Sequence, residues 1–342
     1  MAYPRCTFFA GPRRGSCRQL ARRRCPDRLQ TPAARSPTDA VAHGDALPCP
    51  DTGPHRRTDA RTHGHAPVSA VPELPKSESA GRIRSVTLKH GSGDGYVQLA
   101  AGSIKNSTEH PDADLRAAVT TQSLPFAIEK NSGEPQILIM HTHATESYQT
   151  WPDPVFDENY TARSKNAALN MVAVGAEMAR VLNAAGINTL HDTTLYDAPG
   201  YTSSYQRSRA GVQDYLARYP SIKIVLDVHR DAIEDSDGTR VKPVCEIDGE
   251  STAQVMVIAG CDNGGSAALP NWRLNLRFAA AWEAAMEGAY PGLTRPVLCG
   301  YRFYNQDLTT GSLLIEIGGH ANTLDEALRA GRYAAEGLAK IL

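Results

Sequence analysis

Two histidines and a glutamate follow a short apolar run, and this stretch limits the possible folds more than any other part of the chain. Ile137 to Met140 are four consecutive apolar residues, a pattern that predicts a strand buried on both faces. His141, His143 and Glu146 come directly after it. Imidazole and carboxylate groups are costly to bury at a strand end unless they hold something. Because zinc accepts both groups as ligands, the stretch predicts a divalent-metal site.

Two later stretches repeat this arrangement of an apolar strand with a reactive side chain near its end. Residues 222–228 precede His229, and residues 312–317 include Glu316. Strand patterns alternate with helical ones, which predicts an α/β fold, specifically a three-layer sandwich around a mostly parallel central sheet. In such sheets, sites form beyond the carboxyl ends of the strands. We therefore expect the three reactive segments to meet at one edge of the sheet.

The apolar spacing predicts several further elements. The expected helices are residues 167–185, 202–217, 271–286 and 323–341. The other expected strands are residues 82–88, 96–99, 187–190, 255–259 and 297–304. Residues 151–165 predict an exposed loop that forms a rim beside the site. The hydroxyl-rich stretch 201–209 is adequately explained by the start of a helix.

Composition divides the 342 residues unevenly. Residues 1–80 are rich in Arg, Pro, His and Thr and poor in large apolar residues, so we expect them to be disordered or to result from a wrongly assigned start. Residues 81–130 are interpreted as an N-terminal extension of the core, and residues 131–342 as a catalytic domain. The net charge of -1 gives no reason to expect a nucleic-acid partner.

Three protein ligands and one open position are typical of a catalytic zinc site. Glu146 and His229 are the firmest candidates for metal ligands. The third is His141 or His143, which would project to the same side if the strand continued through them. We favour His141, because it lies right at the strand end, and keep His143 as its substitute. The alternative is that the two histidines are ordinary polar loop residues.

Glu316 is the candidate general base, since a carboxylate near a metal can take a proton from water and deliver it to a leaving amine. The alternative is a structural ion pair with Arg230 or Arg302. Those two arginines are also candidates for binding a substrate carboxylate or an oxyanion. Asn305 lies in a polar group just before the Glu316 strand and is a candidate for hydrogen bonds to substrate.

Several motifs in order resemble the stage II sporulation protein P family. The resemblance covers roughly residues 131–342, with weaker similarity from about residue 82. It rests on residues 141–148 (HTHATESY), 227–232 (DVHRDA), 271–276 (NWRLNL), 304–307 (YNQD), 314–319 (LIEIGG) and 322–327 (NTLDEA). Any one of these motifs alone would be weak evidence, whereas the set in this order is specific.

The resemblance implies the fold of a zinc-dependent N-acetylmuramoyl-L-alanine amidase. The family cleaves peptidoglycan during engulfment of the forespore, and a second, peptide-cleaving activity is attributed to it. Stage II sporulation proteins D and M are its implied partners. Carried onto this chain, the metal ligands fall on the His-x-His-x-x-Glu stretch and His229, with Glu316 as the catalytic acid and base.

Two other functions remain open at this stage. A zinc carboxypeptidase or peptidoglycan endopeptidase could use the same metal ligands. A cell-wall-binding scaffold with an inactive site is the non-enzyme alternative, although a full set of His and Glu residues argues against it.

The expected localisation rests on the family resemblance and not on a targeting signal in this chain. Family members carry an N-terminal membrane anchor that places the catalytic domain outside the cytoplasm. Residues 1–80 show no anchor, the first residues lack the apolar core of a secretion signal, and no stretch reaches about 18 consecutive apolar residues. Because peptidoglycan lies outside the membrane, we expect extracytoplasmic action.

Overall fold

The structure is a computed structural model, and it describes residues 80–342 except 122, 153, 199, 266 and 267. The chain divides into two units, residues 1–66 and 67–342. The expectation of disorder for residues 1–80 falls almost wholly outside the described residues.

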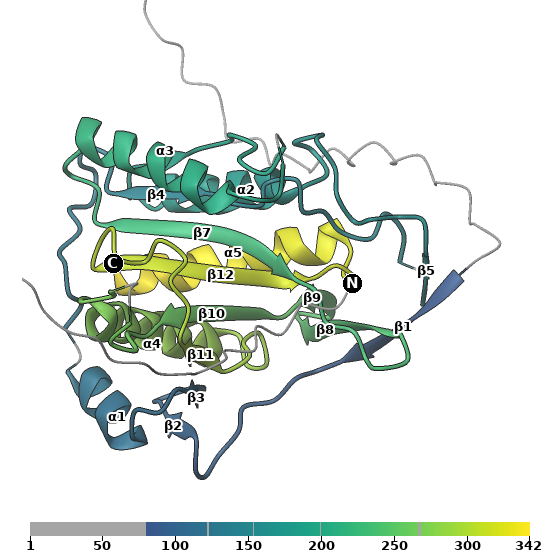
Figure 1. The fold of residues 1–342 in the computed structure, drawn as a ribbon, viewed down its shortest axis with the longest axis horizontal. Coiled ribbons are helices and arrows are strands. Elements are labelled where there is room, and N and C mark those ends of the chain that lie inside the picture. Colours follow the sequence, from purple (N-terminus) through teal and green to yellow (C-terminus); the bar gives the residue numbers. More distant parts are fainter. Residues whose placement is uncertain (1–79, 122, 153, 199, 266–267) are drawn as a thin grey trace, which may run out of the picture. The chain divides into compact units, whose positions relative to one another are not determined.

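A mostly parallel sheet of eight strands runs through the described residues (Figure 1). Only the β2–β3 and β10–β12 pairs in it are antiparallel. In spatial order the strands are β2 (Tyr96–Gln98), β3 (Ser103–Ser107), β11 (Val297–Gly300), β10 (Val255–Gly260), β12 (Gly311–Gly319), β7 (Ile224–Asp231), β4 (Ile137–Met140) and β6 (Thr189–His191). The prediction of a mostly parallel central sheet is confirmed.

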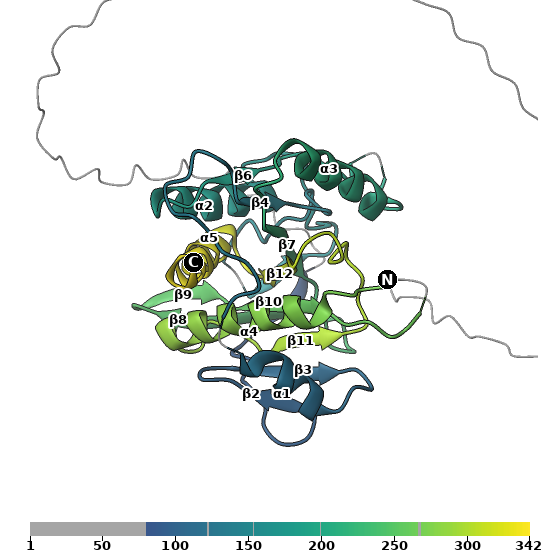
Figure 2. The same cartoon turned by 90° about the vertical axis from the view of Figure 1, so that its left-hand side faces the viewer.

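Helices cover both faces of this sheet, which confirms the three-layer α/β sandwich. Figure 2 shows α3 on one face of the sheet and the other helices on the opposite face. The larger layer consists of α1 (Asp112–Thr120), α2 (Met171–Ala184), α4 (Trp272–Ala289) and α5 (Leu324–Ile341). The smaller layer is α3 (Ser204–Arg218). The two layers are therefore unequal.

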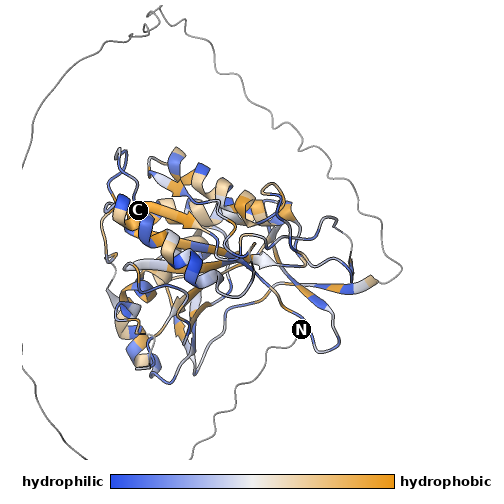
Figure 3. Ribbon diagram, turned by 45° about the horizontal axis from the view of Figure 1, so that its top comes forward, coloured by the Kyte–Doolittle hydropathy of each residue, from blue (hydrophilic) through white to orange (hydrophobic). Residues whose placement is uncertain are grey.

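Side chains along β4 alternate between two cores, which explains why all of its residues are apolar. Ile137 and Ile139 belong to the large core beneath α2, α4 and α5, whereas Leu138 and Met140 pack in a second core that includes Val212 of α3. Successive residues of a strand face opposite sides of the sheet, so a strand covered on both sides needs apolar residues at every position. Figure 3 shows the hydrophobic colour along the central strands and mixed colours along the helices.

The predicted helices all form, with ends that differ from the predictions by a few residues. Gly186 adopts a left-handed φ of 79° just after α2, which is the backbone geometry of a helix C-terminal cap. Thr323 and Glu326 form a capping box at the start of α5, which satisfies backbone N–H groups there. No helix among the described residues is long and apolar enough to cross a membrane.

A second, smaller sheet contains the elements that the sequence patterns predicted least well. In spatial order its strands are β5 (Val155–Asp157), β1 (Ala80–Val86), β8 (Arg240–Ile247) and β9 (Glu250–Ala253). Only β1 was predicted. The predicted rim loop 151–165 therefore contains a strand, β5, that pairs with β1. Strand β3 and helix α1 were also missed.

Candidate metal centre

The end of β4 determines where the two histidines point. The side chain of His141 lies on the same side of the sheet as those of Ile137 and Ile139. Its ring is therefore on the α2 side, where Nε2 is 2.9 Å from His191 Nε2. Gly175 of α2 makes room for it, because a Cβ there would lie 2.5 Å from His141 Nε2. The strand ends at Met140, and residues 142–145 form a turn.

This turn sends His143 to the opposite side of the sheet from His141. The expectation that both histidines project to the same side is wrong, because it required the strand to continue through them. Of the two candidates, the substitute His143 and not the favoured His141 lies on the side of Glu146 and His229. The structure brings His143 into one buried group with Glu146 and His229, and it leaves His141 out of that group.

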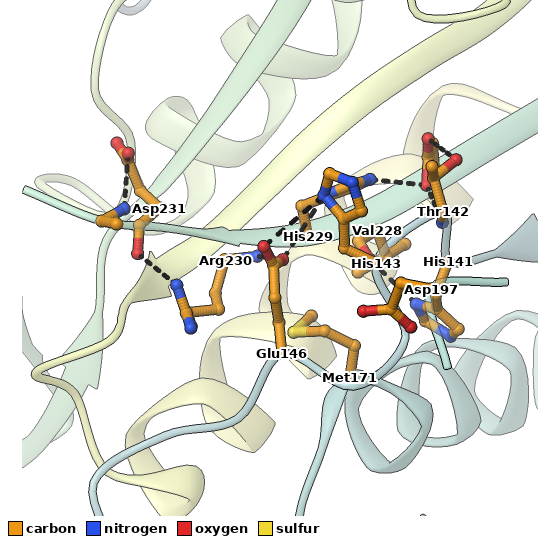
Figure 4. A network of polar contacts seen from close by, with 12 residues as sticks. His141, Thr142, His143, Glu146, Met171, Asp197, Val228, His229, Arg230 and Asp231 are labelled. Atoms are coloured by element: carbon orange, nitrogen blue, oxygen red, sulfur yellow. Dashed lines mark hydrogen bonds and ion pairs between the residues drawn. The ribbon is translucent and has the colours of Figure 1, made fainter. Parts of the chain in front are cut away.

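The three side chains of this group point toward one another (Figure 4). One potential ligand atom from each residue lies within 4.8 Å of those of the other two. The carboxylate of Glu146 is 3.6 Å from His143 Nδ1 and 3.4 Å from His229 Nδ1. Two imidazole nitrogens and a carboxylate oxygen are the donor types that catalytic zinc sites use.

Each histidine of the group is held through its other ring nitrogen. His229 Nε2 lies 2.8 Å from Asp227 Oδ1, and His143 Nε2 lies 3.1 Å from Ser204 Oγ of α3. When His229 donates its Nε2 proton to Asp227, its Nδ1 lone pair faces Glu146. Outer partners of this kind fix the tautomer and orientation of metal-ligating histidines. The arrangement therefore fits a divalent metal at the two Nδ1 atoms and Glu146.

The protonation states of His143 and Glu146 suit metal binding, whereas His229 carries a proton. Burial and the neighbouring His229 lower the pKa of His143 to about 4, so its imidazole is neutral and has a free lone pair at neutral pH. Burial alone would raise the pKa of Glu146, but His229 and Arg230 outweigh it and bring that pKa to about 2. Burial likewise opposes charge on His229, yet Asp227 and Glu146 raise its pKa well above the usual value. A metal binding here would displace the His229 proton.

Glu316 lies on the neighbouring strand, directly beside the group. In the β12–β7 ladder it is paired in register with His229, and paired residues of neighbouring strands face the same side of the sheet. Burial and the nearby Asp231 carboxylate raise the pKa of Glu316 to about 8. Among the described residues, its buried Oε2 has no hydrogen-bond partner. The structure thus gives no support to the alternative of an ion pair with Arg230 or Arg302.

Replacing Glu316 by glutamine should make the stability of the metal-stripped protein less dependent on pH. The folded pKa of about 8 lies above the ordinary 4.5, so the stability linked to the protonated carboxyl is complete below about pH 4.5 and is lost as the pH rises through 8. A pKa difference of that size corresponds to roughly 3–5 kcal/mol. Urea unfolding of both proteins should show Glu316→Gln gaining on wild type between pH 5 and pH 9. A gap that stays constant with pH would contradict the assignment.

The predicted substrate-binding residues do not all reach the group. The guanidinium of Arg230 is buried and donates to the backbone oxygens of Ser147 and Ala162, so it joins the loops around the site. Asn305 donates to the backbone oxygen of Tyr205 in α3. Arg302 lies exposed in the loop after β11. For Arg230 and Asn305, hydrogen bonds within the protein occupy the donors that were expected to meet substrate.

Sequence reasoning missed three residues that the structure places at the site. Arg163, from the predicted rim, lies 3.6 Å from Glu146 and 3.0 Å from Asp197. Ser204 and Tyr205 come from the first turn of α3. The hydroxyl-rich stretch 201–209 was the signal for these two, but a helix start explained it equally well.

Comparison with known proteins gives one family and one curated relative. The stage II sporulation protein P family matches residues 83–339. Stage II sporulation protein P of Bacillus subtilis (strain 168) is 30% identical over 269 residues, which cover 73% of this chain and 64% of that relative. The chain therefore spans less than two thirds of the length of this relative.

Solved structures of amidases are similar at a more remote level. N-acetylmuramoyl-L-alanine amidase AmiC2 of Nostoc punctiforme is 12% identical with a TM-score of 0.34, covering 61% of this chain and 96% of that one. The CwlD amidase of Clostridioides difficile, solved in complex with the GerS lipoprotein, is 10% identical with a TM-score of 0.38, covering 60% and 98%. Both the identities and the TM-scores are low.

Proposed function

The chain belongs to the stage II sporulation protein P family, and from this premise we propose that it is a zinc-dependent N-acetylmuramoyl-L-alanine amidase acting on peptidoglycan during sporulation. The observation that carries the proposal is the buried group of His143, Glu146 and His229 with Glu316 in register beside it. Hydrolysis of an amide needs an activated water, a stabilised carbonyl oxygen and a proton for the leaving amine. The zinc ion that this group would hold serves the first two needs, and Glu316 serves the first and the third.

Each residue of the site has a distinct proposed role. His143, Glu146 and His229 would hold the zinc ion, which when bound polarises a carbonyl and lowers the pKa of water. Glu316 takes a proton from the attacking water as the carbon–oxygen bond forms. It then delivers that proton to the nitrogen of L-alanine as the carbon–nitrogen bond breaks.

The strand position of Glu316 supports its role in proton transfer. Glu316 and Asp227 lie on the face of the sheet that α3 covers, and His143 and Glu146 follow β4. A carboxylate carried by a paired strand keeps its position relative to His229 during the reaction. We infer that the rigid β7–β12 ladder supplies this geometry.

The products of peptidoglycan digestion test the proposal. An amidase frees intact stem peptides that begin with L-alanine, and leaves the glycan strands whole. We expect mass spectrometry of the soluble products of the zinc-loaded full chain to show these peptides. Shortened or split peptides would instead indicate a carboxypeptidase or endopeptidase using the same metal ligands. Binding to sacculi without any released product would indicate a scaffold with an inactive site.

Family membership also suggests the location and the partners of the protein. We propose that it acts outside the cytoplasm, where peptidoglycan lies, and in association with the membrane. Stage II sporulation proteins D and M are the proposed partners. Co-purification from sporulating cells, with the Glu316→Gln form used to keep sacculi intact, would test both partners together.

A further inference from the structure

The first turn of α3 lies over the metal-ligand group, and it presents a tyrosine to it. Ser204 of this turn contacts His143, as described above. The ring of Tyr205 meets the His143 ring edge to face, with centroids 5.5 Å apart and an interplanar angle of 77°. Tyr205 is therefore a direct neighbour of a proposed metal ligand.

The position of Tyr205 is fixed from two sides. Its ring stacks on Tyr304, with centroids 5.3 Å apart and planes 19° from parallel. Its backbone oxygen accepts a hydrogen bond of 3.0 Å from Asn305 Nδ2. Tyr304 and Asn305 both have left-handed φ angles, 43° and 56°, so a strained turn brings them to α3. A ring held this way needs little reorganisation to act on a substrate.

The side chain of Tyr205 ends in a hydrogen-bond donor. A tyrosine hydroxyl carries its proton at neutral pH and can donate it in a hydrogen bond. The ring contact with His143 places this side chain beside the proposed metal ligands.

We propose that the Tyr205 hydroxyl donates a hydrogen bond to the carbonyl oxygen of the scissile amide as negative charge develops on that oxygen. This inference rests on the proposed function and adds a protein hydrogen-bond donor at the carbonyl oxygen that a bound zinc ion would polarise. Donors fixed before the reaction, in a site that excludes water, stabilise an oxyanion far more than donors in water do. No bond to Tyr205 forms or breaks, and its proton stays on the phenol oxygen.

The test removes only the hydroxyl. Tyr205→Phe keeps the stack on Tyr304 and the contact with His143. In the zinc-loaded full chain acting on purified disaccharide-peptide, we expect kcat to fall roughly 10²–10³-fold with KM little changed. Zinc content should equal that of wild type. Tyr215→Phe is the matched control, because Tyr215 lies on the same helix and packs against the second core. It should behave like wild type.

A binding measurement separates transition-state stabilisation from a structural role. A muramyl peptide with a phosphinate in place of the amide carries its negative charge where the oxyanion forms. Calorimetry should show that Tyr205→Phe weakens binding of this analogue roughly 10-fold or more, while binding of an uncleaved muramyl peptide to Glu316→Gln is unaffected by adding Tyr205→Phe.

The outcomes distinguish this inference from the proposed function. If wild type cleaves and Tyr205→Phe cleaves as fast, the role of Tyr205 is overturned and the amidase stands. Loss of zinc from Tyr205→Phe would also overturn it, since the residue would then act through the metal ligands. If wild type frees no peptide with N-terminal alanine, both the amidase and the role of Tyr205 fail.

Discussion

Replacing Glu316 by glutamine is expected to lower the rate of peptidoglycan hydrolysis roughly 10²–10⁴-fold, which is the usual contribution of a general acid–base group. Glutamine has the same shape but can neither take a proton from water nor return one to the amine. Glu316 lies in register with His229 and, among the described residues, its Oε2 is buried without a hydrogen-bond partner. The rate of release of soluble peptide from sacculi, measured with equal amounts of folded protein, checks the expectation.

Glu283→Gln is the matched control for this variant. Glu283 is also a buried glutamate whose pKa is raised by burial, but it lies on α4, on the opposite side of the sheet from α3. Its replacement should leave the rate of hydrolysis unchanged. Equal losses in the two variants would mean that buried glutamates matter here for folding rather than for catalysis. A near-wild-type rate in Glu316→Gln would show that another group transfers the proton.

Removing the His143 imidazole is expected to abolish high-affinity zinc binding, and hydrolysis with it. His143 Nδ1 lies 3.6 Å from the Glu146 carboxylate, so His143→Ala takes away one of three converging ligands. Loss of an outer partner typically weakens metal affinity about 10–100-fold, and loss of a ligand should exceed this. Asp227→Asn, which alters the partner of His229, should therefore fall between wild type and His143→Ala. Zinc affinity by competition with a chelating dye gives the order.

His141→Ala provides the control that decides between the two histidines. His141 is buried against α2 and 2.9 Å from His191, so this variant should be less stable but should still bind one zinc ion per folded chain. Zinc content is measured on the folded fraction, with circular dichroism as the check on folding. Zinc loss in His141→Ala together with retention in His143→Ala would reverse the proposed ligand set.

The sequence was sufficient to predict the sheet and the strands that carry the reactive residues. Four apolar residues in a row before His141 indicate a strand covered on both faces, and β4 is covered by α2 and α3 in just that way. The alternation of strands and helices then places the ends of β4, β7 and β12 at one edge. These are strong signals because burial on two faces leaves little freedom in residue type.

The choice between His141 and His143 could not be made from spacing. Two residues separated by one position lie on the same side of a sheet only if both belong to the strand. Strand β4 ends at Met140, before either histidine. The position of a strand end depends on the turn that follows it, and the space for the His141 ring depends on Gly175, which lies on another element. Tyr205 was missed for a related reason. Its role depends on where α3 packs, and a hydroxyl-rich helix start looks the same whether or not it covers a site.

The measurement that tests the central claim most directly is the formation of new alanine N-termini in sacculi as zinc is removed and restored. The full chain is stripped with a chelator, and zinc is returned in increasing amounts. Amino-group labelling then identifies each new N-terminal residue. We expect no labelled alanine without metal, and a signal that rises until one zinc ion per chain is bound. Alanine release that persists in the stripped protein, or new termini other than alanine, would contradict a zinc-dependent amidase.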